Sequence, residues 1–105
     1  MIGAILTFRY TDGFDPELLR HIAETARPTF EGMPGLRSKT FTLNPAKREA
    51  VNFYVWESEE AAKRLSSEQV MERVTTLYGV RPTVDLVEIA VLVDNAAPRQ
   101  STRNT

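Results

Sequence analysis

The spacing of apolar residues changes several times along the chain, and these changes divide it into structural elements. Residues 2–10 are rich in Ile, Leu, Phe and Tyr and stop at a Thr-Asp-Gly turn signal, which is typical of a strand. Residues 15–30 have apolar residues three or four positions apart, which predicts a helix with Asp15 as its N-cap and proline at its first position. Pro28 lies in the last turn, where we expect a kink.

The second half of the chain predicts four more elements. Residues 35–43 and 50–56 are extended runs joined by a charged turn, which indicates a hairpin. Residues 58–79 have helical spacing that breaks at two consecutive serines and ends at a glycine, so we expect one interrupted helical element. Residues 83–94 predict the last strand.

The order of these elements is strand, helix, strand, strand, helix, strand. This βαββαβ order predicts an α+β protein of the ferredoxin-like class, with a four-stranded antiparallel sheet and the helices on one face. The chain has 105 residues, which is enough for one core without disulfides. We therefore expect one domain over residues 1–95 and a polar, mobile tail over 96–105.

The sheet is predicted to be apolar on both faces. Helices can cover only one face, yet residues 53–56 and 89–93 are continuous apolar runs rather than alternating ones. An apolar sheet face left in water promotes aggregation, so the pattern favours a homodimer in which two copies pack sheet to sheet. The alternative is that this face forms the wall of a pocket in a monomer.

Composition removes several classes of function. The chain has no cysteine, which excludes disulfides, thiolate metal sites and cysteine nucleophiles. Its 13 Lys and Arg against 14 Asp and Glu give a net charge of −1, which disfavours a nucleic-acid partner. The first apolar run has no basic lead and is interrupted by Thr7 and Arg9, so we expect no membrane span and a cytoplasmic protein. No nucleotide, metal or serine-hydrolase motif is present, so no cofactor is predicted.

Three ring-bearing side chains are candidates for chemistry. His21, the only histidine, is a candidate general base, although helical geometry places it about 140° from the apolar stripe, where a surface role is simpler. Tyr54 and Trp56 alternate onto one face of a strand, where they could orient an aromatic substrate in an apolar cavity. The alternative for these two is an ordinary core aromatic pair.

Charged strand residues provide the remaining candidates. Arg9 and Glu88 lie on strands that are neighbours in this fold, so a structural salt bridge between them is expected, with Arg9 as a secondary site candidate. Lys39 could contact an anionic substrate or enolate. The alternative is that Lys39 discourages edge-to-edge pairing of an edge strand.

Three segments of the chain carry a resemblance to a known family. They are EGMPGLRSKTFTLNPAKREA at 31–50, NFYVWESEEAAKRL at 52–65 and LYGVRPTVDLVEIAVLVDN at 77–95. The motifs within them are Pro-Gly-Leu followed by Lys39, and Trp-Glu-Ser-Glu-Glu-Ala from Trp56. The sequence resembles the dimeric α/β-barrel superfamily and, within it, the YdhR-like monooxygenases.

The resemblance implies a monooxygenase that uses neither metal nor flavin. A small aromatic or enolisable substrate, once deprotonated, would donate an electron directly to O₂ in an apolar cavity between sheet and helices. Tyr54, Trp56 and Lys39 match family-like positions, and Arg9 is a nearby candidate. Haem-degrading relatives use an Asn, Trp and His trio, and residues 69–78 contain no histidine, so haem degradation is not expected.

Two other classes of function stay open at this point. The first is an O₂-independent cyclase or isomerase of the same fold, which needs a pocket acid–base pair; His21 inside the cavity would favour it. The second is a non-catalytic small-molecule-binding or stress-response dimer, which a cavity without perturbed ionisable groups would favour.

Overall fold

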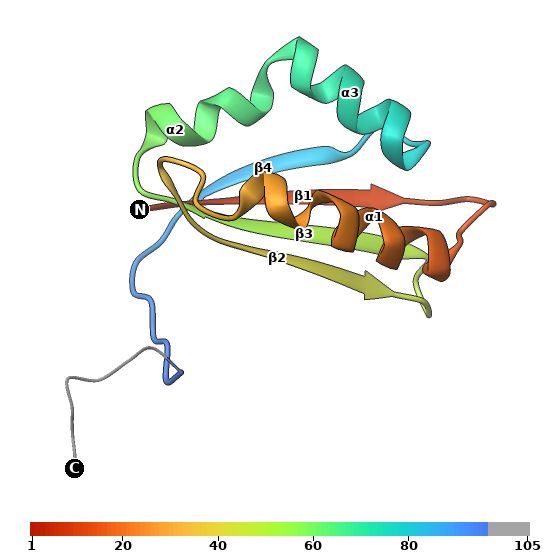
Figure 1. Ribbon diagram of the computed structural model, residues 1–105, viewed down its shortest axis with the longest axis horizontal. Coiled ribbons are helices and arrows are strands. Elements are labelled where there is room, and N and C mark those ends of the chain that lie inside the picture. Colours follow the sequence, from red (N-terminus) through yellow and green to blue (C-terminus); the bar gives the residue numbers. More distant parts are fainter. Residues whose placement is uncertain (97–105) are drawn as a thin grey trace.

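The computed structural model describes residues 1–96, in which one four-stranded sheet carries helices on one of its faces (Figure 1). The sheet order is β2-β3-β1-β4, and all neighbours are antiparallel. This arrangement confirms the predicted ferredoxin-like α+β class. The elements in chain order are β1 (Ile2–Arg9), α1 (Pro16–Phe30), β2 (Leu36–Asn44), β3 (Glu49–Trp56), α2 (Glu59–Lys63), the 3₁₀ helix η1 (Arg64–Ser66), α3 (Glu68–Tyr78) and β4 (Thr83–Glu88).

The first helix forms where the sequence predicts it. The Asp15 side chain accepts a hydrogen bond from the Leu18 N–H at 3.2 Å, which satisfies one of the free donors at the start of α1. Pro28 lies inside the helix, which nevertheless continues to Phe30. A proline here removes only one backbone hydrogen bond, one turn before the helix ends.

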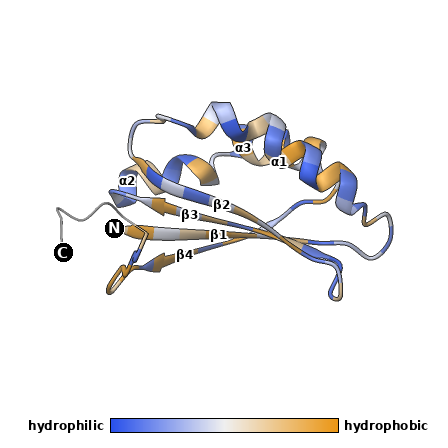
Figure 2. Ribbon diagram, turned by 60° about the horizontal axis from the view of Figure 1, so that its bottom comes forward, coloured by the Kyte–Doolittle hydropathy of each residue, from blue (hydrophilic) through white to orange (hydrophobic). Residues whose placement is uncertain are grey.

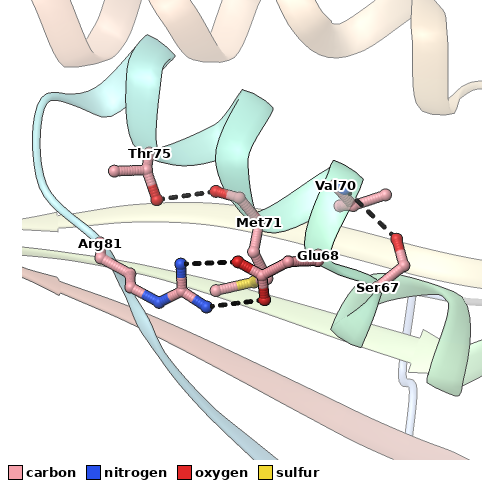
Figure 3. Close-up of polar contacts among 6 residues, drawn as sticks. All are labelled: Ser67, Glu68, Val70, Met71, Thr75 and Arg81. Atoms are coloured by element: carbon pink, nitrogen blue, oxygen red, sulfur yellow. Dashed lines mark hydrogen bonds and ion pairs between the residues drawn. The ribbon is translucent and has the colours of Figure 1, made fainter.

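The interruption of the second helical element is also confirmed, and α3 is held firmly at its start (Figure 3). The Ser67 hydroxyl accepts a hydrogen bond from the Val70 N–H at 3.3 Å. Arg81, which lies in the connection between α3 and β4, forms an ion pair with Glu68 at 3.3 Å. The helix ends at Gly79, whose φ of 84° is the left-handed conformation that glycine adopts most readily. These contacts fix the helix that forms one wall of the site.

The last strand is shorter than predicted. β4 ends at Glu88, and the apolar residues 89–93 form no strand. At this point Ile2, the first residue of β1, lies opposite Glu88, and one further bond joins the Ile89 N–H to the Met1 carbonyl. Pairing of β4 with β1 thus ends where β1 itself begins. The predicted tail lies, from residue 97, outside the described residues.

The core lies between the sheet and the helices. Inward positions of β1 and β3 alternate, so Ala4, Leu6 and Phe8 face Tyr54, Asn52 and Ala50, and all six are buried beneath the helices. Hydrophobic residues occur all along the strands (Figure 2). On the other face of the sheet, the Phe53 ring and Val87 close over Gly3. In residues 1–96, no helix combines the length and apolar character needed to cross a membrane.

Candidate functional site

An apolar cavity of about 750 Å³ lies between α1, α3 and β3. Trp56 and Tyr54 contribute its sheet wall, and α1 and α3 contribute Leu, Ile, Ala and Val side chains. Among the described residues that line it, the charged or titratable ones are His21, Arg64, Arg73 and Tyr54, and none is an Asp or Glu. The size and apolar character are those of a site for a small hydrophobic molecule.

The two aromatic residues predicted from the strand alternation are both in this cavity. Tyr54 and Trp56 are 2% and 3% exposed, and their rings stack with centroids 5.9 Å apart and planes 9° from parallel. Both point toward the helices because they occupy alternate positions of β3. The stacked pair is buried in the core and also lines the cavity, and its role toward a substrate stays a prediction.

Trp56 has an unused hydrogen-bond donor. Its indole Nε1–H is buried and has no partner among the described residues. A buried polar group without a partner costs about 1–3 kcal/mol, and most such groups in folded proteins are satisfied. Because Trp56 lines the cavity, its unpartnered donor is a candidate partner for an oxygen atom of a bound molecule.

The tyrosines around the cavity are held in their neutral form. Burial raises the pKa of Tyr54, and repulsion from the neighbouring Tyr78 raises it further. Burial also raises the pKa of Tyr78. Both hydroxyls therefore keep their protons at neutral pH, and neither serves as a base.

Sequence reasoning missed a buried polar pair next to Tyr54. The Asn52 amide Nδ2 donates to the Tyr78 hydroxyl at 3.0 Å, and the Tyr78 ring stacks on Phe8 with centroids 3.9 Å apart. Tyr10 donates its hydroxyl proton to the Tyr78 carbonyl at 2.8 Å. The signal for Asn52 was present, because it shares the inward side of β3 with Tyr54 and Trp56, where a polar residue needs a buried partner.

Lys39 is enclosed by aromatic rings instead of extending into solvent. Its Nζ lies 3.4 Å from the ring centroid of Phe30, 4.2 Å from that of Phe41 and 4.4 Å from that of Tyr54. Burial lowers the pKa of Lys39 from 10.5 to about 7. β2 is an edge strand, as the alternative prediction assumed, but this side chain turns inward over the rings. It does not line the Trp56 cavity.

Of the two remaining candidates, His21 borders the Trp56 cavity and Arg9 does not. His21 is exposed on α1, as predicted, yet it also borders the mouth of the cavity, with its Nε2 3.5 Å from the Thr25 hydroxyl. Arg9 is outside the cavity and pairs with Glu49 at 3.1 Å. The predicted pair of Arg9 with Glu88 is wrong: β1 and β4 are antiparallel, so the two residues are at opposite ends of the sheet.

No group of three His, Asp or Glu side chains within residues 1–96 is placed to hold a metal ion. The donor set of the cavity, an indole N–H, hydroxyls and guanidinium groups, is likewise not one that metals prefer. The site is instead suited to an organic molecule with an oxygen acceptor.

Comparison with known proteins identifies the fold. SnoaB from Streptomyces nogalater, a cofactor-independent oxygenase, matches with a TM-score of 0.63 and 17% identity over 88% of this chain and 95% of that one. A monooxygenase from the gene ActVA-Orf6 of Streptomyces coelicolor, in complex with nanaomycin D, matches with a TM-score of 0.61 and 23% identity over 89% and 92%. An antibiotic biosynthesis monooxygenase matches with a TM-score of 0.57 and 17% identity over 87% and 100%.

This chain has the fold of these monooxygenases. At this level of identity the likeness establishes the arrangement of the elements and leaves the reaction to be argued from the site. No family model matches the chain, and none of the curated proteins matches it in sequence. The more specific YdhR-like resemblance stays a prediction.

Proposed function

We propose that this protein is a cofactor-independent monooxygenase that acts on a small aromatic or enolisable molecule in the cavity between α1, α3 and β3. The observation that carries the proposal is the buried, unpartnered Nε1–H of Trp56 in the wall of a cavity with no carboxylate among its described lining residues. A largely apolar site with an unpaired buried donor favours a flat molecule that carries an anionic oxygen.

The reaction requires no electrons from the protein. A phenol or an anthrone loses a proton, and the resulting anion donates an electron to O₂. For an anthrone, the ring CH₂ and one O₂ become a carbonyl and one water, so the substrate supplies all the electrons. The protein must exclude water, hold the ring and stabilise the anionic oxygen.

Each of these tasks has a side chain in the cavity. The stacked Tyr54 and Trp56 rings hold a flat substrate, and Trp56 Nε1–H donates to its oxygen. Nε1 is shielded from water, so a ligand reaches it only when side chains of the cavity wall move aside. His21 at the mouth takes the substrate proton, since the tyrosines stay protonated.

The shared fold supports the proposal without deciding it. SnoaB is a cofactor-independent oxygenase, and the Streptomyces coelicolor monooxygenase binds nanaomycin D. The YdhR-like resemblance points to the same class of reaction. Each of these likenesses concerns the scaffold, and the Trp56 donor is the feature of this chain that supplies the chemistry.

The experiment is oxygen uptake by metal-stripped protein with a panel of hydroquinones, anthrones and related phenols. We expect protein-dependent uptake that survives chelators, and a loss of at least tenfold in kcat/KM for Trp56→Phe, which removes the donor and keeps an aromatic ring. Tyr10→Phe is the control, because Tyr10 lies outside the cavity and loses only a hydroxyl. No uptake across the panel, or equal uptake by the Trp56 variant, would overturn the proposal.

A second candidate is an O₂-independent cyclase or isomerase, which the position of His21 favours. His21 borders the cavity that contains Tyr54, so a His and a Tyr are present at one site. Incubation of the same panel without oxygen separates the two functions. Product that forms anaerobically and depends on His21 indicates the isomerase, and binding without turnover in either atmosphere indicates a non-catalytic binding protein.

We also propose that the protein forms a homodimer through the sheet face opposite the helices. This face presents Ile5, Val51 and Phe53, and the apolar residues 89–93, which follow β4, form no strand in the described chain. Light scattering should give twice the chain mass, and Phe53→Glu should give a monomer. Thr76→Glu, on the exposed side of α3, is the control. A monomeric wild-type protein would contradict the proposal.

The cytoplasmic location stays a prediction.

A further inference from the structure

A second hollow of about 740 Å³ lies on the other side of α1, between that helix and strands β2 and β3. It shares no lining residue with the Trp56 cavity. Leu19, Ala23 and Arg27 of α1 line this hollow, and the intervening helical positions line the cavity. Helix α1 therefore separates two distinct spaces. Lys39 lines the second one, and Asn52 and Tyr78 belong to its wall.

The Lys39 amine is held in place by rings instead of by a charge. Its Nζ lies within 4.4 Å of three ring centroids, those of Phe30, Phe41 and Tyr54. Within residues 1–96 it forms no ion pair. A long side chain confined in this way has lost most of its freedom, so its terminal nitrogen occupies a defined position beside the hollow.

The acidic residues that line the same hollows as Lys39 form ion pairs with another residue. Glu24 shares the second hollow with Lys39, and Glu31 shares a smaller neighbouring one. Both pair with Arg27, at 3.7 Å and 3.3 Å. The other charged groups that line these hollows are Arg20 of α1 and Arg37 of β2, neither of which can neutralise an ammonium ion.

We propose that the second hollow is a separate small-molecule site in which Lys39 captures an aromatic aldehyde or ketone as an imine. The nitrogen lone pair of Lys39 forms a bond to the carbonyl carbon while the carbonyl π bond breaks. A proton moves from nitrogen to oxygen, and loss of water then forms the C=N bond. Amine and carbonyl thus give imine and water, with no oxidant or reductant.

The surroundings of Lys39 favour each part of this step. Burial lowers the pKa of Lys39 to about 7, so a large share of the amine carries a free lone pair at neutral pH. Tyr78, whose hydroxyl accepts from Asn52 and keeps its own proton, lines the same hollow and is the candidate donor to the leaving oxygen. Phe41 lines it too, so the substituent of an aromatic carbonyl would lie against a ring.

The chain offers its own controls for the test, because it contains three lysines and the other two, Lys47 and Lys63, are exposed. Folded protein is incubated at pH 7 with 4-hydroxybenzaldehyde and cyanoborohydride, which reduces the imine to a stable amine. Trypsin does not cleave after the modified lysine, so an adduct on Lys39 appears in peptide 38–47. We expect Lys39 to be labelled at least tenfold faster than Lys47 and Lys63, and labelling of all three at similar rates would refute the proposal.

A matched pair of helix variants tests the place of capture. Ala23→Leu fills the second hollow and Ala26→Leu fills the Trp56 cavity, and both alanines are half-buried on α1. We expect Ala23→Leu to slow Lys39 labelling at least fivefold and Ala26→Leu to leave it unchanged. Equal effects of the two variants would overturn the assignment. Oxygen uptake should respond in the opposite way, so failure of either proposal leaves the other intact.

Discussion

Replacing Lys39 by Met should stabilise the protein, and the gain should depend on pH. In the fold the pKa of Lys39 is about 7, against 10.5 for the ordinary group. Between these pH values the unfolded chain binds a proton that the folded chain does not, so the stability of the wild type rises with pH. The free-energy cost of burying the charged form of Lys39 is therefore fully present below about pH 7 and disappears above about pH 10.5. Methionine has a similar length, remains uncharged and packs well against rings.

The expected gain in the free energy of unfolding depends on the pKa shift of Lys39 and on the attraction between its ammonium ion and the surrounding rings. At 1.36 kcal/mol per pH unit, the interval from 10.5 to about 7 sets a ceiling of about 5 kcal/mol on the cost of the charge. The ring faces of Phe30, Phe41 and Tyr54 attract an ammonium ion by ~0.5–2 kcal/mol and reduce that cost. We expect Lys39→Met to gain about 3 kcal/mol at pH 6.5 and about half of that at pH 9.5.

The assay is urea unfolding at one fixed protein concentration, from pH 6 to pH 9.5, with Lys47→Met as the control for losing an exposed lysine. The range stops there because burial raises the pKa of Tyr10, Tyr54 and Tyr78, whose ionisation in the unfolded chain destabilises the fold at higher pH. A gain that does not change with pH would reflect packing alone. A Lys39→Met variant less stable than wild type at pH 6.5 would show that the rings prefer the ammonium ion, and would refute the reasoning.

Two further substitutions test the buried network and a turn. Asn52→Leu should lower the free energy of unfolding in urea by about 1–3 kcal/mol, because the Tyr78 hydroxyl loses its partner. The double variant with Tyr78→Phe should recover part of this loss, and additive losses would contradict the coupling. Gly79→Ala should lower the free energy of unfolding by about 1 kcal/mol, because Gly79 has a φ of 84°, and an unchanged stability would show that this cap contributes nothing.

The parts of the fold that depend on neighbours in sequence were predictable. Strand alternation placed Tyr54 and Trp56 on one face, and the capping residues Asp15 and Gly79 marked helix ends that the structure confirms. These features follow from local spacing, because side chains repeat every two residues in a strand and every 3.6 in a helix.

The parts that depend on register and tertiary contact were not predictable from spacing. The ion pair of Arg9 was assigned to the wrong strand, because adjacency of β1 and β4 does not say which residues lie opposite one another. The enclosure of Lys39 needed three rings from three elements: Phe30 at the end of α1, Phe41 on β2 and Tyr54 on β3. Only the packed structure brings these together, so the sequence left open whether Lys39 contacts an anionic substrate or guards an edge strand.

Helix α1 and strand β3 divide the interior into two chemical environments. On β3, Trp56 and Tyr54 line the apolar cavity, and Asn52 with Ala50, further along the same strand face, lines the polar hollow. On α1, alternate sides of one helix line the two spaces. The unpartnered Trp56 donor therefore lies on one side and the confined Lys39 amine on the other. The Tyr54 ring contacts both the Trp56 ring and the Lys39 amine. The two spaces have separate lining residues, but they are not independent, because the Lys39 amine rests on the rings of Phe30 and Tyr54, which also line the Trp56 cavity.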